Sequence, residues 1–130
     1  MRVDSLAWTL DCQYIKTSMK EKKLSGIVKE MAQQILCRKD SSLEAIGVAI
    51  KIVHIAWNFA HEEYKDEPGY TFGIKEIQER IGSVKNELIS DNVEGMAEKL
   101  MAYKLKNYRT DKRTIFICEF KNGNVRVSWR

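Results

Sequence analysis

The feature that most constrains this chain is the stretch from Ser41 to Tyr64, which is apolar on almost every side when it is drawn as a helix. Its polar residues recur at alternating three- and four-residue steps, so they occupy a single narrow face of that helix. They are Glu44, Lys51, His54, Asn58 and His61, with Gly47 on the same line. A helix with so little polar surface must be covered by other elements on most sides. We therefore expect the 41–64 helix to be the centre of the fold, with Ser41 and Glu44 as a capping box at its start.

The composition is typical of one ordinary globular domain. The 130 residues are 44% apolar and 31% charged, and the formal net charge of +4 permits a nucleic-acid or acidic partner without requiring one. Three widely spaced cysteines predict neither a disulfide framework nor a zinc site, and the segment 61–63 lacks the two-histidine spacing of a zinc-protease helix. We therefore expect no metal and no other cofactor. The first residues lack a secretory pattern and no apolar run reaches the length of a membrane span, so we expect a cytoplasmic protein with no membrane partner.

Two segments precede the central helix. The Ser18–Glu21 capping box and the apolar stripe behind it predict a surface helix that ends near Cys37. For residues 1–17 we favour a short helix after Asp4, with a strand over Trp8–Tyr14 as the alternative, because short apolar runs are ambiguous.

Two more helices are predicted after the central one. Pro68-Gly69 marks a turn, and apolar residues at strict three-four spacing then predict one helix from Ile74 to Leu88. Ser90-Asp91-Asn92 breaks this pattern and caps a helix that continues to about residue 105. Because the link between these two helices is so short, we expect them to pack as an antiparallel pair.

The last seventeen residues, 114–130, predict a β-hairpin. Asn122-Gly123 is the favoured two-residue turn, since both of its central positions need a positive φ. This turn sets a register that places apolar pairs on one face and an opposite-charge pair on the other. The pairs are Phe120 with Val125, Cys118 with Val127 and Phe116 with Trp129, and on the other face Glu119 with Arg126. We expect helices to cover one face, and the N-terminal segment could add a third strand.

These elements predict an α+β fold. We expect a mostly helical single domain, residues 1–130, with four or five helices around the buried 41–64 helix and a C-terminal β-hairpin at 114–130.

The polar line on the central helix is the first candidate for chemistry. A histidine such as His54 titrates in the range that a general base needs, and Asn58 and Lys51 would stand beside it if this face lined a cleft. That arrangement would suit a helical hydrolase or ribonuclease. His54 and His61 are two turns apart, roughly 10 Å, which is too far for direct proton transfer. The competing interpretation is a polar seam that only fixes the rotation of a buried helix.

An acidic segment follows the central helix. It contains Glu62, Glu63, Asp66 and Glu67, with Tyr70 nearby as a possible aromatic anchor. A compact, mostly helical domain with a terminal hairpin is similar in kind to bacterial immunity proteins, and the segment 55–60 resembles helices of that class. The resemblance implies a protein that binds a cognate toxin, often a nuclease, and occludes its active site. The competing interpretation is a solvated helix exit.

A basic segment before the hairpin is the third candidate. Its cations, interleaved with Tyr103 and Tyr108, suit phosphate backbones and stacked bases. They are Lys104, Lys106, Arg109, Lys112 and Arg113. A solvated loop is the competing interpretation.

A second resemblance concerns residues 74–130. From Ile74-Lys75-Glu76-Ile77 through Gly82 to Asp111-Lys112-Arg113 and the hairpin, the chain resembles winged helix-turn-helix regulators of the multidrug-resistance type. The resemblance implies that Lys85 and Asn86 approach bases and that Lys112, Arg113 and Lys121 meet phosphates. The chain departs from that pattern because its apolar stripe continues unbroken through Gly82, which favours one long helix.

No nucleophile, base and oxyanion donor assemble in the sequence, so we expect a binding protein and not an enzyme. The favoured function is a toxin-neutralising immunity protein that binds through the acidic segment. Nucleic-acid binding through the basic segment is the alternative, and hydrolysis at His54 is the third hypothesis.

Overall fold

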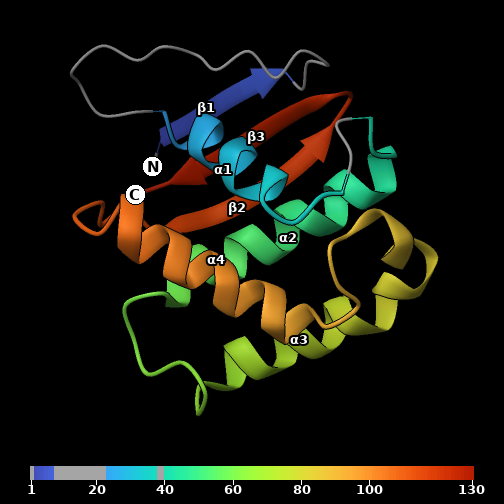
Figure 1. The fold of residues 1–130 in the computed structure, drawn as a ribbon. Helices are drawn as coiled ribbons and strands as arrows, with labels where there is room; N and C mark the ends of the chain where they lie inside the picture. The colour runs from blue at the N-terminus through green and yellow to red at the C-terminus, as the bar shows by residue number, and fades with distance from the viewer. Residues whose placement is uncertain (1, 8–22, 38–39) are drawn as a thin grey trace.

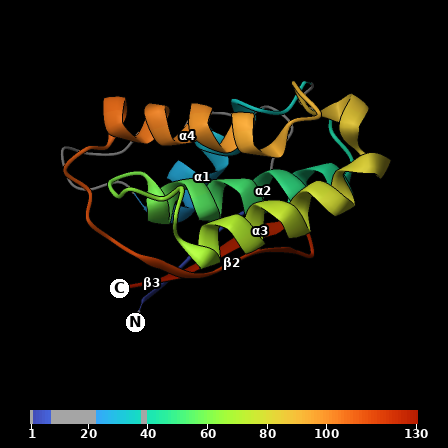
Figure 2. The ribbon, with the colours of Figure 1, turned by 90° about the horizontal axis from the view of Figure 1, so that it is seen from below.

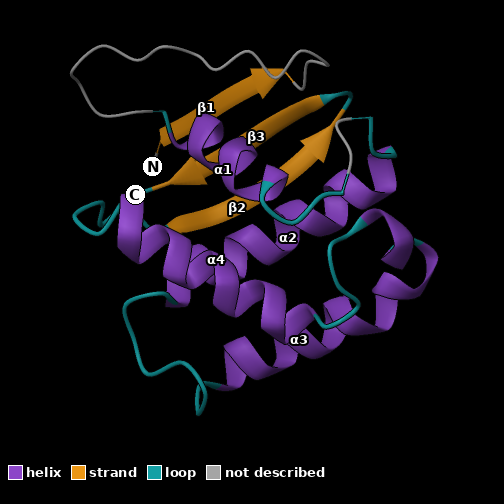
Figure 3. Ribbon diagram, viewed as in Figure 1, coloured by secondary structure: helices purple, strands orange, loops and turns teal. Residues whose placement is uncertain are grey.

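A computed structural model describes residues 2–7, 23–37 and 40–130. These residues form four α-helices, two short 3₁₀ turns and a three-stranded antiparallel sheet, which confirms the α+β fold (Figures 1 and 3). In chain order the elements are β1 (Arg2–Ala7), α1 (Leu24–Gln33), α2 (Leu43–Phe59), α3 (Pro68–Arg80), the turns η1 (Ile81–Ser83) and η2 (Lys85–Glu87), α4 (Val93–Asn107), β2 (Ile115–Lys121) and β3 (Asn124–Trp129).

Helix α2 is the centre of the fold, as predicted. It packs against α1, α3, α4 and strand β2, so it lies between β2 and the helices α3 and α4, while α1 packs on β1 and β3 beside it (Figures 1 and 2). It is shorter than the predicted 41–64 helix, since it ends at Phe59 and residues 60–64 form a turn that leaves it. At its start Ser42 and not Ser41 is the N-cap, and the Ser42 hydroxyl accepts from the Ala45 amide at 3.1 Å. Glu44 does not close a capping box with Ser41. Its carboxylate instead accepts a hydrogen bond from the Ser83 hydroxyl at 2.8 Å.

The hairpin forms with the predicted turn and most of the predicted register. Asn122 and Gly123 have φ of 54° and 79°, and the pairs from Lys121–Asn124 to Cys118–Val127 lie opposite one another. The predicted pair Phe116–Trp129 is wrong, because a β-bulge between Ile115 and Ile117 brings Ile115 opposite Trp129. The extra residue turns Phe116 outward, where it is 46% exposed, and places Ile115 in the core at 2%.

The N-terminal segment adds the third strand. Residues 2–7 pair antiparallel with β3, so the sheet order is β1-β3-β2, and the helix predicted after Asp4 is wrong for residues 5–7. Pairing wins over helical periodicity here because β3 would otherwise present an unpaired edge. The remaining residues of that prediction, the alternative strand at 8–14 and the capping box at 18–21 lie outside the described residues.

Helix α1 is capped by a residue far from it in sequence. Lys23 precedes the helix without a side-chain cap, and Asp4 on β1 supplies one by accepting from the Leu24 amide at 2.6 Å. The same carboxylate oxygen accepts from the Trp129 indole N–H at 3.2 Å. Asp4 therefore ties β1, β3 and the start of α1 together.

The predicted helix from Ile74 to Leu88 breaks after Arg80. Its apolar residues are all buried, but the chain passes through η1 and η2 on the way to Leu88. The Ile89 amide donates to Ile35, and the Cys37 amide donates to Glu87, so this segment pairs with the chain beyond α1. This tertiary pairing redirects the backbone at a place where sequence periodicity predicts continuous helix.

The ends of α3 and α4 follow familiar capping rules. Pro68 and Gly69, predicted as a turn, are the first residues of α3, where proline is favoured because its missing N–H would have had no helical partner. The predicted cap at 90–92 forms, and within it Asn92 is the residue that caps α4, by accepting from the Gly95 amide at 3.1 Å. Helices α3 and α4 run in opposite directions (Figures 1 and 2).

Candidate functional site

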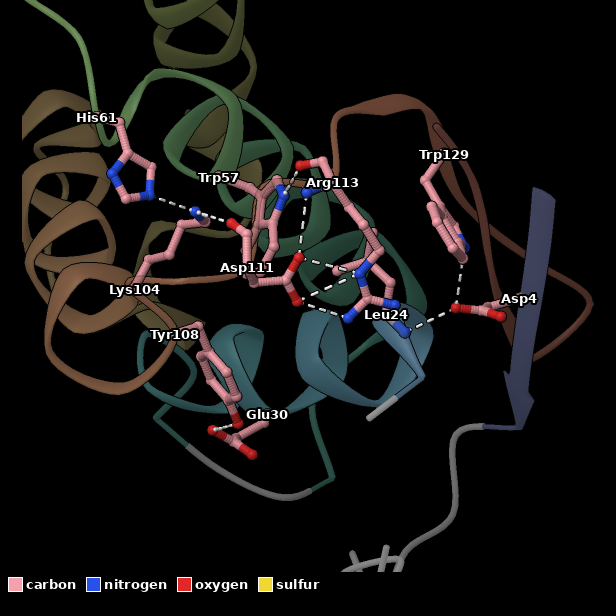
Figure 4. A network of polar contacts seen from close by, with 10 residues as sticks. All are labelled: Asp4, Leu24, Glu30, Trp57, His61, Lys104, Tyr108, Asp111, Arg113 and Trp129. Carbon is pink, nitrogen blue, oxygen red and sulfur yellow. Dashed lines mark hydrogen bonds and ion pairs between the residues drawn. The ribbon is translucent and has the colours of Figure 1, made fainter. Parts of the chain in front are cut away.

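Polar side chains from three segments meet where α2 and α4 end and the connection to β2 begins (Figure 4). Trp57 comes from the last turn of α2, and His61 follows that helix. Lys104 comes from the last turn of α4, and Asp111 and Arg113 from the connection. We call these five residues the α2/α4 cluster.

Lys104 is the most constrained member of the cluster. Its side chain is buried, with 1% of the residue exposed, and its Nζ lies 4.3 Å from the centroid of the Trp57 ring. The ammonium donates to His61 Nε2 at 2.7 Å and to the Asp111 carbonyl oxygen at 3.0 Å. Burial lowers its pKa to about 8. A buried lysine of reduced basicity is frequent in active sites, but here each contact joins parts of the fold.

His61 is exposed and lies among cations. Desolvation and then the positive charges of Lys104, Lys112 and Arg109 lower the pKa of its imidazole. Because Lys104 donates to Nε2, the neutral ring carries its proton on Nδ1. His61 is therefore an acceptor that holds the end of α2 to α4.

Asp111 and Arg113 form a local ion pair that shapes the connection. Nη2 of Arg113 lies 2.6 Å from Oδ2 of Asp111, and the Arg113 amide also donates to this carboxylate at 3.1 Å. The two side chains are only 8% and 10% exposed. The Arg113 carbonyl accepts from the Trp57 indole N–H at 2.7 Å, and its guanidinium lies 4.9 Å from the Trp129 ring centroid. The pair fixes the chain between α4 and β2.

Glu30 on α1 anchors the other side of this region. Its carboxylate accepts from the hydroxyls of Tyr103 at 2.5 Å and Tyr108 at 2.7 Å. Burial and these hydrogen bonds to an anion raise the pKa of both tyrosines. The two tyrosines predicted to stack on bases are therefore engaged inside the molecule.

The polar line on α2 divides into parts with different roles. Asn58 and His54 hydrogen-bond the backbone of Ile115 on β2, and burial lowers the pKa of His54. The His54 imidazole, which the hydrolase hypothesis makes a general base, is part-buried against the Ile115 carbonyl oxygen. The first half of the line, with Glu44 and Lys51, borders a shallow groove shared with Arg80 of α3.

The acidic segment Glu62–Glu67 is exposed. Its four carboxylates, on Glu62, Glu63, Asp66 and Glu67, form no ion pair with the described residues. Tyr64 and Lys65, between them, reach Glu98 on α4, at 3.2 Å from the Tyr64 hydroxyl and 3.9 Å from the Lys65 ammonium. The middle of the segment is therefore attached to the domain.

Tyr70 was the predicted aromatic anchor of this surface, and the structure corrects that prediction. Only 1% of the residue is exposed, so Tyr70 belongs to the core. Its ring packs against Phe59 and Tyr64, with centroids 5.6 and 4.7 Å away. Its buried hydroxyl has no hydrogen-bond partner among the described residues. Helical spacing explains the difference, since Tyr70 lies four residues before Ile74 on the buried face of α3.

The basic segment is only partly available to a ligand. Lys104 is buried, and the Arg113 side chain is paired with Asp111. The prediction that these two residues contact phosphates is therefore wrong. Lys106, Arg109 and Lys112 are exposed.

The residues carried over from the winged-helix pattern also lie in different settings. Lys85 and Asn86 lie in the short turn η2 and not on a long reading helix, while Lys121 is exposed at the end of β2.

Within residues 2–7, 23–37 and 40–130, no group of three or more His, Cys, Asp or Glu residues could hold a metal ion. No helix of that part is long and apolar enough to cross a membrane.

The chain matches no protein family, no curated protein and no solved structure with which it was compared. The candidate sites therefore depend on the geometry described above.

Sequence reasoning missed the α2/α4 cluster, although one signal for it is present. Lys104 follows Leu100 by four residues and Met101 by three, so it continues the buried stripe of α4. A lysine on an apolar stripe is a sign of an internal partner. The contacts of Asp4 with Leu24 and Trp129 have no comparable signal, because they join residues 20 and 125 positions apart.

Proposed function

We propose that this chain is a non-catalytic protein-binding module that neutralises a bacterial toxin of the nuclease type by occluding its active site. The observation that carries the proposal is the exposed acidic segment Glu62–Glu67, in which four carboxylates have no counter-ion among the described residues. A nuclease active site is basic where it binds phosphates, so an acidic segment is complementary to it.

The attachment of the segment favours tight binding. Tyr64 and Lys65 contact Glu98, and the Tyr64 ring packs on buried Tyr70, so the chain is held at its middle while the carboxylates face solvent. A segment ordered before binding loses less conformational entropy in the complex. Its uncompensated negative charge would also steer a basic partner during encounter.

The polar side chains that could serve as catalytic groups form hydrogen bonds inside the molecule, which supports a non-catalytic role. His54 and Asn58 bond the Ile115 backbone, and Lys104 bonds His61 and the Asp111 carbonyl. A general base or nucleophile must instead reach a substrate.

The test begins with capture of the partner. Tagged protein is incubated with lysate of its native cells, with and without nuclease, and the captured protein is identified. We expect one basic protein that survives nuclease treatment. A variant that combines Glu62→Lys, Glu63→Lys, Asp66→Lys and Glu67→Lys should bind that partner at least tenfold more weakly. Its association rate should also depend less on salt.

A control variant with the same change in net charge shows whether the loss of affinity comes from the acidic segment or from the net charge of the protein. It places lysine at four exposed acidic positions elsewhere, Asp40, Glu76, Glu79 and Asp91. The control should retain most of the affinity. Equal losses in the two variants would show that the acidic segment is not the binding surface, and a captured partner without toxin activity would contradict the immunity function.

Nucleic-acid binding is the second candidate, supported by the exposed cations Lys106, Arg109 and Lys112, of which Arg109 and Lys112 act on the charge of His61. It predicts retention on DNA or RNA that falls with salt and is lost in Arg109→Glu with Lys112→Glu. Retention unchanged by these two substitutions would rule out this surface.

A further inference from the structure

The hydrogen bond between Lys104 and His61 depends on the protonation state of the histidine. The Lys104 ammonium is held by the Asp111 carbonyl oxygen and the Trp57 ring, and it has almost no exposed surface through which to turn away. Below its pKa of about 8 Lys104 is an ammonium with donors and no acceptor, so His61 Nε2 must then supply the lone pair for the 2.7 Å contact.

Protonation of His61 removes that lone pair. The imidazolium carries a proton on both nitrogens and would face the Lys104 ammonium at the same short distance. The charges around the ring do not compensate, because Lys112 and Arg109 in the connection after α4 are also positive. The Asp111 carboxylate is paired with Arg113, and only its backbone carbonyl contacts Lys104. His61 itself is exposed, so it can rotate into solvent.

We propose that the His61–Lys104 contact is a proton-sensitive latch that holds the start of the acidic segment against α4 and opens when His61 is protonated. His61 directly precedes Glu62, and it is joined to the end of α2 by only the residue Ala60. When the latch opens, the attachment of this stretch to α4 at His61 is lost, and the contacts of Tyr64 and Lys65 with Glu98 remain. Mildly acidic solution should therefore increase the mobility of residues 61–63. The latch belongs to the isolated chain and does not rest on the proposed function.

Nuclear magnetic resonance on the whole protein tests the latch. At pH 7.5 the ¹⁵N shifts of His61 should show a neutral ring with its proton on Nδ1. On acidification His61 should titrate below pH 6.5, and amide exchange at residues 61–63, corrected for intrinsic rate, should rise at least threefold with the same midpoint.

Two variants connect this behaviour to the contact. His61→Gln keeps an acceptor for Lys104 but does not titrate, so exchange at 61–63 should stay slow throughout the titration. Lys104→Met should raise the midpoint of His61 toward 6.5 and make exchange at 61–63 fast already at pH 7.5. If Lys104→Met does not fold, the wild-type and His61→Gln comparison decides the question.

The contrary results are equally definite. A proton on Nε2 of His61 at pH 7.5, or a midpoint at or above 6.5 in the wild type, would overturn the latch. The same would follow if exchange at 61–63 rose equally in wild type and His61→Gln. His54, which contacts the Ile115 carbonyl oxygen on β2, is the internal comparison, and its own titration midpoint should not coincide with the rise of exchange at 61–63.

Discussion

The side-chain amide of Asn58 pairs with both backbone groups of Ile115, as a neighbouring strand would. Its Nδ2 donates to the Ile115 carbonyl oxygen at 2.8 Å, and its Oδ1 accepts from the Ile115 amide at 2.9 Å. His54, one turn earlier on α2, contacts the same carbonyl at 3.1 Å. Helix α2 thereby closes the edge of β2 at the bulge, where the residue is buried and its backbone could not reach water.

Replacement of Asn58 by leucine should destabilise the fold. The Ile115 amide would stay buried without a partner, at a cost of about 1–3 kcal/mol in the free energy of unfolding. Urea denaturation measures this loss. Asn107→Leu is the matched control, because Asn107 is exposed and, among the residues that the structure describes, its side chain bonds only the Tyr103 carbonyl of its own helix. A cost in Asn58→Leu no greater than in the control would show that the bidentate pair does not contribute to stability.

The Asp111–Arg113 pair should behave as one unit. Asp111→Asn or Arg113→Met removes one charge of a nearly buried ion pair, and each should cost about 3 kcal/mol of unfolding free energy. The double variant removes both charges, so it should cost about 2 kcal/mol less than the sum of the two single changes. Thermal or urea unfolding of the four proteins measures the coupling. Simple additivity would mean that the two side chains stabilise the connection independently.

Lys104 should give the protein a characteristic pH dependence of stability. Its pKa falls from 10.5 to about 8 in the fold, because burial disfavours the ammonium. Between pH 8 and 10.5 the unfolded chain holds a proton that the folded chain has released, so this residue makes stability rise with pH. The free energy of unfolding of the wild type, minus that of Lys104→Met, should increase by about 1–3 kcal/mol across that interval.

The comparison with Lys104→Met is necessary because Cys118 acts in the opposite direction. Burial raises the pKa of its thiol to about 12, so stability falls above pH 9 in both proteins alike. Urea denaturation at pH 7.5, 9 and 10 gives the difference. Parallel pH profiles of wild type and variant would contradict the depressed pKa of Lys104.

Asp4→Ala should loosen the junction of β1, β3 and α1. The change removes the acceptor for the Leu24 amide and for the Trp129 indole, and loss of an N-terminal helix cap alone costs about 1 kcal/mol. We expect a total loss of about 2 kcal/mol, with faster amide exchange in the first turn of α1. Ser5→Ala, at the next and exposed position of β1, should change stability by less than about 0.5 kcal/mol. Equal stability of the two variants would show that Asp4 is not a functioning cap.

Local chemistry in the sequence is sufficient for the α+β class, the buried α2, the α4 cap at Asn92 and the Asn122-Gly123 turn. Each depends on neighbouring residues: apolar spacing around a helix, a side chain that reaches the nearest amides, or a pair that tolerates positive φ. The same reasoning identified the acidic segment as a candidate surface, and its four carboxylates are exposed.

Only the tertiary structure decides the features that join distant segments. The bulge at Phe116 depends on how β2 fits onto Asn58, and the break after Arg80 depends on pairing with residues 35–37. Burial of Lys104 likewise needs His61 and Asp111, which come from other segments. Local periodicity can show that Lys104 needs an internal partner but cannot identify such partners, because the free energy of these contacts appears only when the whole chain has folded.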